Sequence, residues 1–403
     1  MAIGKGLIDP VDSVSGVKFC VLEAGVKYEN RDDFVVIALD DGTKTAGVFT
    51  KNKFCAAPVH VAKKHLSEAS AKYLVINTGN ANAGTGKQGL FDANQTCQML
   101  ADHLGCNKEE VIPFSTGVIG EHLAMDKIKS AINIMPQAEN FNDDYARASS
   151  GIMTTDTRPK ATSTSVNIDG QLVTISGMTK GSGMIKPNMG TMLSFIQTDA
   201  DCSEIDLQAL LLKATNQSFN RITVDSDTST NDACLVSATA QSKVKITQAN
   251  IKQFEQALIE LMQTLAHEMV RDGEGASKFI EIKVKNAVSN EDALSIAYSV
   301  GHSPLVKTAI SASDANWGRI LMAVGKAPAT QLDVDQVDVY LDDVCIVQNG
   351  EKHSEYTEEK GAAVFEKEEF CIVVDLKLGT SEECIWTCDL SYEYIRINAE
   401  YRS

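Results

Sequence analysis

Strand-like and helix-like segments alternate along the whole of this 403-residue chain, and no Pro-, Gly- or Ser-rich linker divides them. Residues 34–39 form a short apolar run that the turn signal DDG ends, and residues 72–77 form a second run typical of a buried strand. A chain of this kind must stack helices on sheets to cover both kinds of apolar surface. The alternation therefore predicts an α/β fold with central sheets covered by helices.

Further elements follow from periodicity and turn chemistry. Residues 90–104 have helical spacing and are followed by Gly105, a typical helix stop. The longest predicted helix covers residues 250–271, in which apolar side chains recur on one face. Asp169 and Gly170 mark the turn of a predicted hairpin. The remaining predicted elements are a hairpin at residues 342–343 and strands at 370–376 and 385–397.

The charge balance restricts the partners. Lys and Arg number 37 against 54 Asp and Glu, which gives a net charge of −17. Such a surface repels nucleic-acid phosphates and anionic membranes, so we expect neither as a partner. A local pocket can still be positive, so small anionic substrates stay open.

The location of the protein follows from its N-terminal residues and its cysteines. The N-terminal ten residues lack an apolar segment and include Asp9, which argues against an export peptide. No stretch reaches the roughly 18 apolar residues needed to cross a bilayer. The ten cysteines are scattered, and no His/Cys cluster has zinc-ligand spacing. We expect a cytoplasmic protein with reduced thiols and no metal site.

Three further motifs are better explained without chemistry. His267 and Glu268 lie on the polar face of the long predicted helix, and no HExxH pattern occurs. The Gly-rich residues 84–89 lack the spacing of either common nucleotide-binding loop. The acidic run at residues 358–369 is typical of a solvated helix face.

The segment at residues 177–195 is different. Its sequence, GMTKGSGMIKPNMGTMLSF, contains four glycines, a proline and an asparagine without periodic pattern, and then enters an apolar run after Thr191. One interpretation is a surface turn that leads into a buried strand. The other is a loop held in an unusual backbone conformation for a chemical purpose. The residues alone allow both.

In the chemical interpretation, Thr191 acts twice. Its hydroxyl first attacks the carbonyl of Gly190 and shifts the acyl group from nitrogen to oxygen; hydrolysis of that ester then leaves Thr191 as a new N-terminus. The freed amine, with an ordinary pKa of about 7.7–8.0, would be the base for the hydroxyl of the same residue. Such a nucleophile would also explain why no recognisable Ser-His-Asp or Cys-His motif occurs.

Residues 180–193, KGSGMIKPNMGTML, closely resemble the self-cleavage signature of the ornithine acetyltransferase family of arginine biosynthesis, also called bifunctional glutamate N-acetyltransferases. The sequence departs from the family at Gly190, where Ala is usual, and in Asp-Ala-Asn at 314–316, where Asp-Pro-Asn is usual. A more mobile Gly190 could slow cleavage. Four further stretches resemble the family in the same order: NTGNANA at 77–83, STGVIG at 115–120, TVDSDTSTND at 223–232 and DANWGR at 314–319.

The resemblance assigns roles to individual residues. Thr116 and Gly117 match the pair that forms an oxyanion hole, the first through its hydroxyl and the second through its backbone N–H. A tetrahedral intermediate needs two such donors. Thr191 matches the nucleophile. The positions that match substrate-binding residues are Thr154 (or its neighbour Thr155), Lys180, Thr191, Glu274, Asn398 and the C-terminal Ser403. Lys180 is suited to hold the α-carboxylate of the substrate. Glu274 is suited either to hold the ammonium of Thr191 or to contact the amine-bearing end of the substrate.

The resemblance also implies the reaction. Thr191 takes the acetyl group from N2-acetyl-L-ornithine and passes it to L-glutamate in a ping-pong mechanism, without a cofactor. Some members of the family also accept acetyl-CoA, and the sequence does not decide this. The implied product of cleavage is an α chain, residues 1–190, and a β chain, residues 191–403, that share one interleaved core and form an α2β2 heterotetramer. The implied fold is similar in layering to the N-terminal-nucleophile sandwiches, with its own connectivity.

Two other classes of function would use parts of the same pattern. A related N-terminal-nucleophile amidase or aminopeptidase would differ only in letting water remove the acyl group from Thr191. A binding protein on the same fold would not need a nucleophile, an oxyanion pair and Glu274 together. The agreement at residues 180–191 and 223–232 favours the transferase.

Overall fold

The computed structural model describes residues 2–7, 9–186 and 192–400. Packing divides the chain into two compact units. The larger unit consists of Leu7–Asn220 and Asp227–Met269, and the smaller unit consists of Met1–Gly6, Arg221–Ser226 and Val270–Ser403. The chain therefore passes from one unit to the other several times, which explains why no linker is visible in the sequence.

One sheet of the larger unit has four strands in the order β1-β2-β4-β5. They are β1 (Val17–Leu22), β2 (Phe34–Leu39), β4 (Tyr73–Asn80) and β5 (Val111–Val118). The β4 and β5 strands are parallel, so their carboxyl ends meet at one edge of the sheet.

The other sheet of the larger unit has five strands in the order β3-β10-β8-β7-β6. They are β3 (Lys44–Phe49), β10 (Ala233–Ala238), β8 (Leu193–Thr198), β7 (Gln171–Lys180) and β6 (Lys160–Ile168). The central strands β8 and β10 are parallel, and every residue of both is buried.

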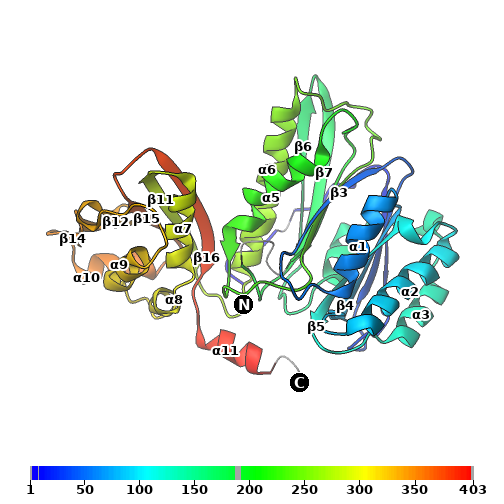
Figure 1. Ribbon diagram of the computed structural model, residues 1–403, viewed down its shortest axis with the longest axis horizontal. Coiled ribbons are helices and arrows are strands. Elements are labelled where there is room, and N and C mark those ends of the chain that lie inside the picture. Colours follow the sequence, from blue (N-terminus) through cyan, green and yellow to red (C-terminus); the bar gives the residue numbers. More distant parts are fainter. Residues whose placement is uncertain (1, 8, 187–191, 401–403) are drawn as a thin grey trace. The chain divides into compact units, whose positions relative to one another are not determined.

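The two sheets pack face to face through one apolar cluster, in which the rings of Phe114 and Phe195 meet edge to face at 5.1 Å. Helices cover the outer faces. Figure 1 shows α2 and α6 on these faces. Cys97 and Leu100 of α2 pack on the four-stranded sheet, and Leu261 of α6 lies against Gly177 of the five-stranded sheet. The helices of this unit are α1 (Ala57–Glu68), α2 (Gly86–Leu104), α3 (Met125–Ile134), α4 (Tyr145–Gly151), α5 (Leu207–Asn216) and α6 (Ile251–Arg271).

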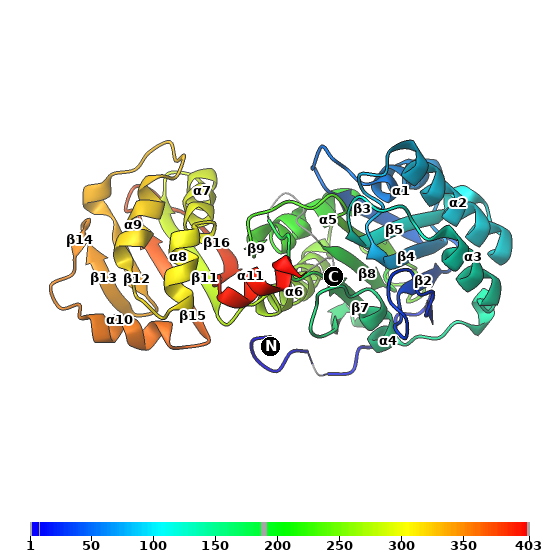
Figure 2. The ribbon, with the colours of Figure 1, turned by 90° about the horizontal axis from the view of Figure 1, so that it is seen from below.

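The smaller unit contains one sheet of seven strands in the order β14-β13-β12-β15-β11-β16-β9. Helices α7, α8 and α9 lie together against it (Figure 2). The strands are β9 (Ile222–Thr223), β11 (Phe279–Ala287), β12 (Asp338–Leu341), β13 (Val344–Gln348), β14 (Glu351–Lys352), β15 (Glu369–Asp375) and β16 (Ser381–Cys388). The helices are α7 (Asn290–Gly301), α8 (Pro304–Ser311), α9 (Trp317–Gly325), α10 (Glu358–Phe365) and α11 (Tyr392–Ala399).

These layers confirm the predicted α/β fold with helices on sheets. The structure confirms three predicted elements, with bounds that agree to within a residue. They are the strand at residues 34–39, the long helix at 250–271 and the hairpin that turns at Asp169. The predicted strand at 385–397 is wrong in its second half. It ends at Cys388, and Ser391 then begins α11 by accepting a hydrogen bond from the N–H of Glu393. The hydroxyl of Ser391 favours the start of a helix at this position, although the apolar spacing of the following residues favours a strand.

No helix in the described part of the chain is both long and apolar enough to cross a membrane.

Candidate functional site

Two of the predicted site residues meet at the edge of the larger unit's sheets. Thr116 lies near the end of β5, and Lys180 is the last residue of β7. Both are buried, and Lys180 Nζ lies 3.2 Å from Thr116 Oγ1. An ammonium can only donate, so the threonine oxygen accepts and its own hydrogen can be directed elsewhere. The contact joins residues that are 64 positions apart and come from different sheets.

Gly117 lies at a place where two backbones touch. Its φ of 133° is in a region that other residues rarely adopt. A Cβ at this position would lie 2.3 Å from the carbonyl carbon of Gly79, which is its partner on β4. No other amino acid fits without moving the strands. The predicted role of its N–H as an oxyanion donor stays a prediction.

Asp156 organises the loops beside Lys180, although it is not among the predicted site residues. One carboxylate oxygen accepts from Lys160 Nζ at 2.7 Å and from the N–H of Gly181 at 2.7 Å. The other accepts from the N–H of Thr154 at 3.0 Å. Burial raises the pKa of Asp156, but the charges of Lys160 and Lys180 outweigh this and hold the pKa well below its ordinary value. The carboxylate is therefore ionised, and it connects the backbone at Thr154 to the backbone at Gly181.

The neighbouring threonines differ in their contacts. Thr154 is held through its backbone N–H by Asp156, whereas the hydroxyl of Thr155 lies 2.7 Å from that of Ser182. Both side chains are half-buried. Which of the two contacts substrate stays open.

Gly190, Thr191 and Ser403 lie outside the described residues, so their predicted roles stay predictions. Residues 192–196 are buried, as predicted, and β8 begins at Leu193. The N–H of Met192 donates to Asp232 Oδ1 at 2.9 Å. Burial raises the pKa of Asp232 well above its ordinary value. A buried carboxyl thus holds the amide that directly follows the predicted nucleophile.

Two other predicted site residues meet in the smaller unit. Glu274 follows α6 in a turn, and one of its carboxylate oxygens accepts a hydrogen bond from Asn398 Nδ2 at 2.8 Å. Glu274 is buried, and Asn398 lies on the exposed helix α11. The start of α11 is attached to the same turn, because Ser391 Oγ donates to the carbonyl of Gly275 at 2.6 Å. The predicted substrate-binding role of this pair stays a prediction.

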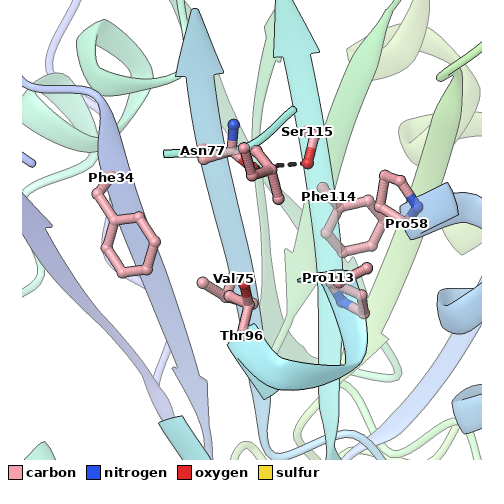
Figure 3. Close-up of a pocket in the computed structure, with 10 residues that line it drawn as sticks. Phe34, Pro58, Val75, Asn77, Thr96, Pro113, Phe114 and Ser115 are labelled. Atoms are coloured by element: carbon pink, nitrogen blue, oxygen red, sulfur yellow. Dashed lines mark hydrogen bonds between the residues drawn. The ribbon is translucent and has the colours of Figure 1, made fainter. Parts of the chain in front are cut away.

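Side chains of the asparagine-rich motif at residues 77–83 stabilise the ends of β4 and β5 through buried hydrogen bonds. Ser115 Oγ donates to Asn77 Oδ1 at 2.6 Å, and Asn77 Nδ2 donates to the carbonyl of Asn80 at 2.9 Å. Figure 3 shows the Asn77–Ser115 hydrogen bond at a small pocket, which is lined by these two residues and by mostly apolar side chains of the sheet and of the helices α1 and α2. These amides replace the ladder hydrogen bonds that are lost at the irregular pairing of Gly79 and Asn80.

The motif at residues 314–319 has a structural explanation in the smaller unit. Asn316 Oδ1 accepts from the N–H of Arg319 and caps α9, and Arg319 donates to the carbonyl of Leu305 at 2.8 Å. Ala315, which stands where the family usually has proline, is buried beside this cap. The motif therefore fixes a helix start.

Metal-binding and disulfide chemistry are absent from the described ranges, which include every cysteine. Within these ranges, no group of three or more His, Cys, Asp or Glu residues could hold a metal ion. All ten cysteines are free thiols.

A family model for the ArgJ family matches residues 18–403. The arginine biosynthesis bifunctional protein ArgJ of Pseudomonas fluorescens is 47% identical over 407 residues, with all of both chains covered. The protein of the same name from Psychrobacter arcticus is 48% identical over 408 residues, again with all of both chains covered. Among solved structures, the Bacillus halodurans protein of that name is 38% identical, with 52% of this chain and 99% of that chain covered and a TM-score of 0.49. An ornithine acetyltransferase from Mycobacterium tuberculosis, complexed with ornithine, is 29% identical, with 43% and 92% covered and a TM-score of 0.38.

Proposed function

The chain belongs to the ArgJ family, and from this premise we propose how it carries out the reaction. It is an acyltransferase of arginine biosynthesis, which moves the acetyl group of N2-acetyl-L-ornithine to L-glutamate. In the proposed mechanism, the chain cuts itself between Gly190 and Thr191. The hydroxyl of Thr191 then attacks the acetyl carbonyl, ornithine leaves with the proton on its amine, and the α-amine of glutamate attacks the resulting ester.

Thr116 and Gly117 stabilise the negative oxygen that forms in each attack. The contact between Lys180 Nζ and Thr116 Oγ1, at 3.2 Å, is the observation that carries this assignment. It supplies a positive charge and turns the threonine hydroxyl into a donor in a buried site, where electrostatic interactions are strong. A charged group is also suited to hold a substrate carboxylate, which is the predicted role of Lys180.

Glu274 and Asn398 are the proposed contacts for the amine-bearing end of the substrate. Glu274 Oε2 already accepts an amide hydrogen from Asn398, so an ammonium group would compete for, or share, the same carboxylate. Ser403 is proposed to contribute at the same end of the substrate.

The second acetyl source and the assembly are also part of the proposal. Relatives that match the full chain are described as bifunctional, which supports acetyl-CoA as an additional acetyl donor. We propose an α2β2 assembly of residues 1–190 and 191–403, working in the cytoplasm. Free thiols at all ten cysteines fit a reducing compartment.

The test is an intact mass spectrum of the purified protein combined with an acetyl-transfer assay. We expect two species, the larger of which begins at Thr191. Their masses should add up to the 43.5 kDa of the chain plus one water, because hydrolysis of the bond adds a water molecule. Transfer to L-glutamate is then measured with N2-acetyl-L-ornithine and, separately, with acetyl-CoA. A single uncut species without transfer would contradict the proposal, and release of acetate instead of N-acetylglutamate would favour the amidase alternative.

A further inference from the structure

Asn231 ties together the ends of two strands that approach the predicted oxyanion hole. Its side chain is buried, and Nδ2 donates to the carbonyl of Ala81 at 2.6 Å and to the carbonyl of Ser115 at 2.8 Å. Ser115 directly precedes Thr116 on β5. Both hydrogens of one amide are therefore used to fix the backbone from which the predicted oxyanion residues extend.

Asp232, the next residue, makes the corresponding contact on the other sheet. Its side chain is fully buried, and Oδ1 accepts from the N–H of Met192 at 2.9 Å. Its backbone carbonyl also accepts from the N–H of Thr50 at 3.0 Å. Asp232 leads directly into β10, and Ala233 of β10 is the register partner of Leu193 on β8. The carboxyl is thus attached at the point where β8 begins.

We propose that Asn231 and Asp232 are positioning residues for the acyl transfer, because this consecutive pair fixes the oxyanion strand to the nucleophile strand. The inference rests on the proposed function, in which Thr116 and Gly117 stabilise the oxyanion and Thr191 attacks. Adjacent Cα atoms of a trans peptide lie about 3.8 Å apart. One rigid dipeptide therefore sets the distance between Ser115, one residue before the oxyanion pair, and Met192, one residue after the nucleophile.

The reaction is sensitive to this distance. The nucleophile must reach the acetyl carbon while the carbonyl oxygen lies within hydrogen-bond distance of both donors, and a misplacement of about 1 Å can cost on the order of 10²-fold in rate. The two groups belong to different sheets, so nothing within either ladder of backbone hydrogen bonds fixes them relative to one another. The side chains of Asn231 and Asp232 supply such a connection, in addition to the contact between Lys180 and Thr116.

The test of Asn231 compares two alanine variants. Asn231→Ala should lower kcat for acetyl transfer by about 10²-fold without a matching change in KM. The control is Asn250→Ala. Asn250 is also buried in the larger unit and also donates two hydrogen bonds from one amide, to Asp169 and to the carbonyl of Lys245. A purely structural role predicts equal losses of thermal stability and equal activities in the two variants, and that result would overturn the proposal.

The test of Asp232 uses rescue by a conservative variant. Asp232→Ala removes the acceptor for Met192 and should lower both the fraction of self-cleaved chain and kcat. Asp232→Asn keeps a side-chain oxygen that can accept from the same N–H. It should restore most of both readouts and should keep the fold even if the alanine variant does not. An asparagine variant as impaired as the alanine variant would overturn the positioning role.

Asp199 provides the matched control, because its Oδ1 also accepts a backbone N–H, that of Thr174, at 2.9 Å in the same unit. Asp199→Ala should leave cleavage and kcat unchanged. Wild-type protein that neither cuts itself nor transfers acetyl groups overturns the proposed function and this proposal with it. Active wild-type protein with equally active Asn231→Ala and Asp232→Ala variants overturns this proposal alone.

Discussion

The predicted site residues of the larger unit are held quite differently from those of the smaller unit. Around Thr116 and Lys180, charged and polar side chains are buried and each makes contacts across loops or sheets. In the smaller unit, Glu274 is held by an amide of α11, a helix of eight residues none of which is buried. Developing charge needs donors that are already fixed, because their reorientation would cost free energy during the reaction. Recognition of a substrate side chain does not need contacts that are fixed to the same degree.

The largest loss of activity is expected from a change of the predicted nucleophile, which belongs to the larger unit. Thr191→Ala should abolish self-cleavage and reduce acetyl transfer to background, because both steps need the same oxygen. Intact mass and an N-acetylglutamate assay measure the two effects. Thr191→Ser, which keeps a hydroxyl, is the control. A Thr191→Ala chain that is still cut between residues 190 and 191 would exclude this residue as the nucleophile.

The next largest effect is expected from the buried ion pair. Asp156→Asn removes the carboxylate charge from the buried ion pair with Lys160 and should cost about 3–5 kcal/mol of unfolding free energy. Glu204→Gln, which breaks the exposed pair with Lys245, should cost far less, because solvent screens exposed charges. Urea unfolding measures both, and equal losses would contradict the contrast between buried and exposed pairs.

The same ion pair predicts a pH dependence. The folded-state pKa of Asp156 is held below its ordinary value, so the stabilisation is fully present above the unfolded pKa of about 3.9. It should be lost as the pH falls from there through the folded pKa. Wild-type protein should be more stable than Asp156→Asn at neutral pH. At a pH below both pKa values, the unfolding free energies of the two proteins should become equal.

Removal of the predicted oxyanion hydroxyl should cost slightly less free energy. Thr116→Ala should lower kcat by about 10²–10³-fold, or about 2.7–4 kcal/mol, while the protein stays folded. Thr239→Ala is the control, because this buried threonine donates to the carbonyl of Ser15 in the same unit. Turnover unchanged by Thr116→Ala would remove Thr116 from the oxyanion hole.

The smallest effect is expected in the smaller unit. Asn398→Ala removes one hydrogen bond to Glu274 from an exposed helix, which corresponds to about 0.5–1.5 kcal/mol. It should raise KM by roughly tenfold or less. Arg396→Ala, on the same helix and paired with Glu393, should leave KM unchanged. A loss of kcat as large as that of Thr116→Ala would show that both regions handle developing charge.

Much of the fold could be predicted because local signals and packing agree there. The strand at 34–39 is apolar throughout and ends at a turn, and the helix at 250–271 has one continuous apolar face. The prediction failed at residues 389–397. Tyr392 and Ile395 look like strand residues, but they are largely exposed on a helix that Ser391 caps.

The site could be predicted only in part. Thr116 and Lys180 were found through motifs that resemble a known family, and the structure places their side chains in contact. Asp156 and Lys160 carry no signal of their own, because a charged pair four residues apart usually lies at the surface. Asn231 and Asp232 lay inside a recognised motif, but their function depends on contacts with residues 115 and 192, which no local pattern reveals.

The order of strands in the five-stranded sheet has a consequence for the molecularity of folding. Strands β3, β6 and β7 precede residue 190, whereas β8 and β10 follow it and lie between them in the sheet. Cleavage at that position would leave two polypeptides that share one sheet, in which β10 and β8 of one polypeptide lie between β3 and β7 of the other. The uncut chain folds in a unimolecular reaction, but the cut protein, once unfolded, could regain this sheet only when two separate molecules meet. Maturation would thus turn an equilibrium that is independent of concentration into one that depends on it.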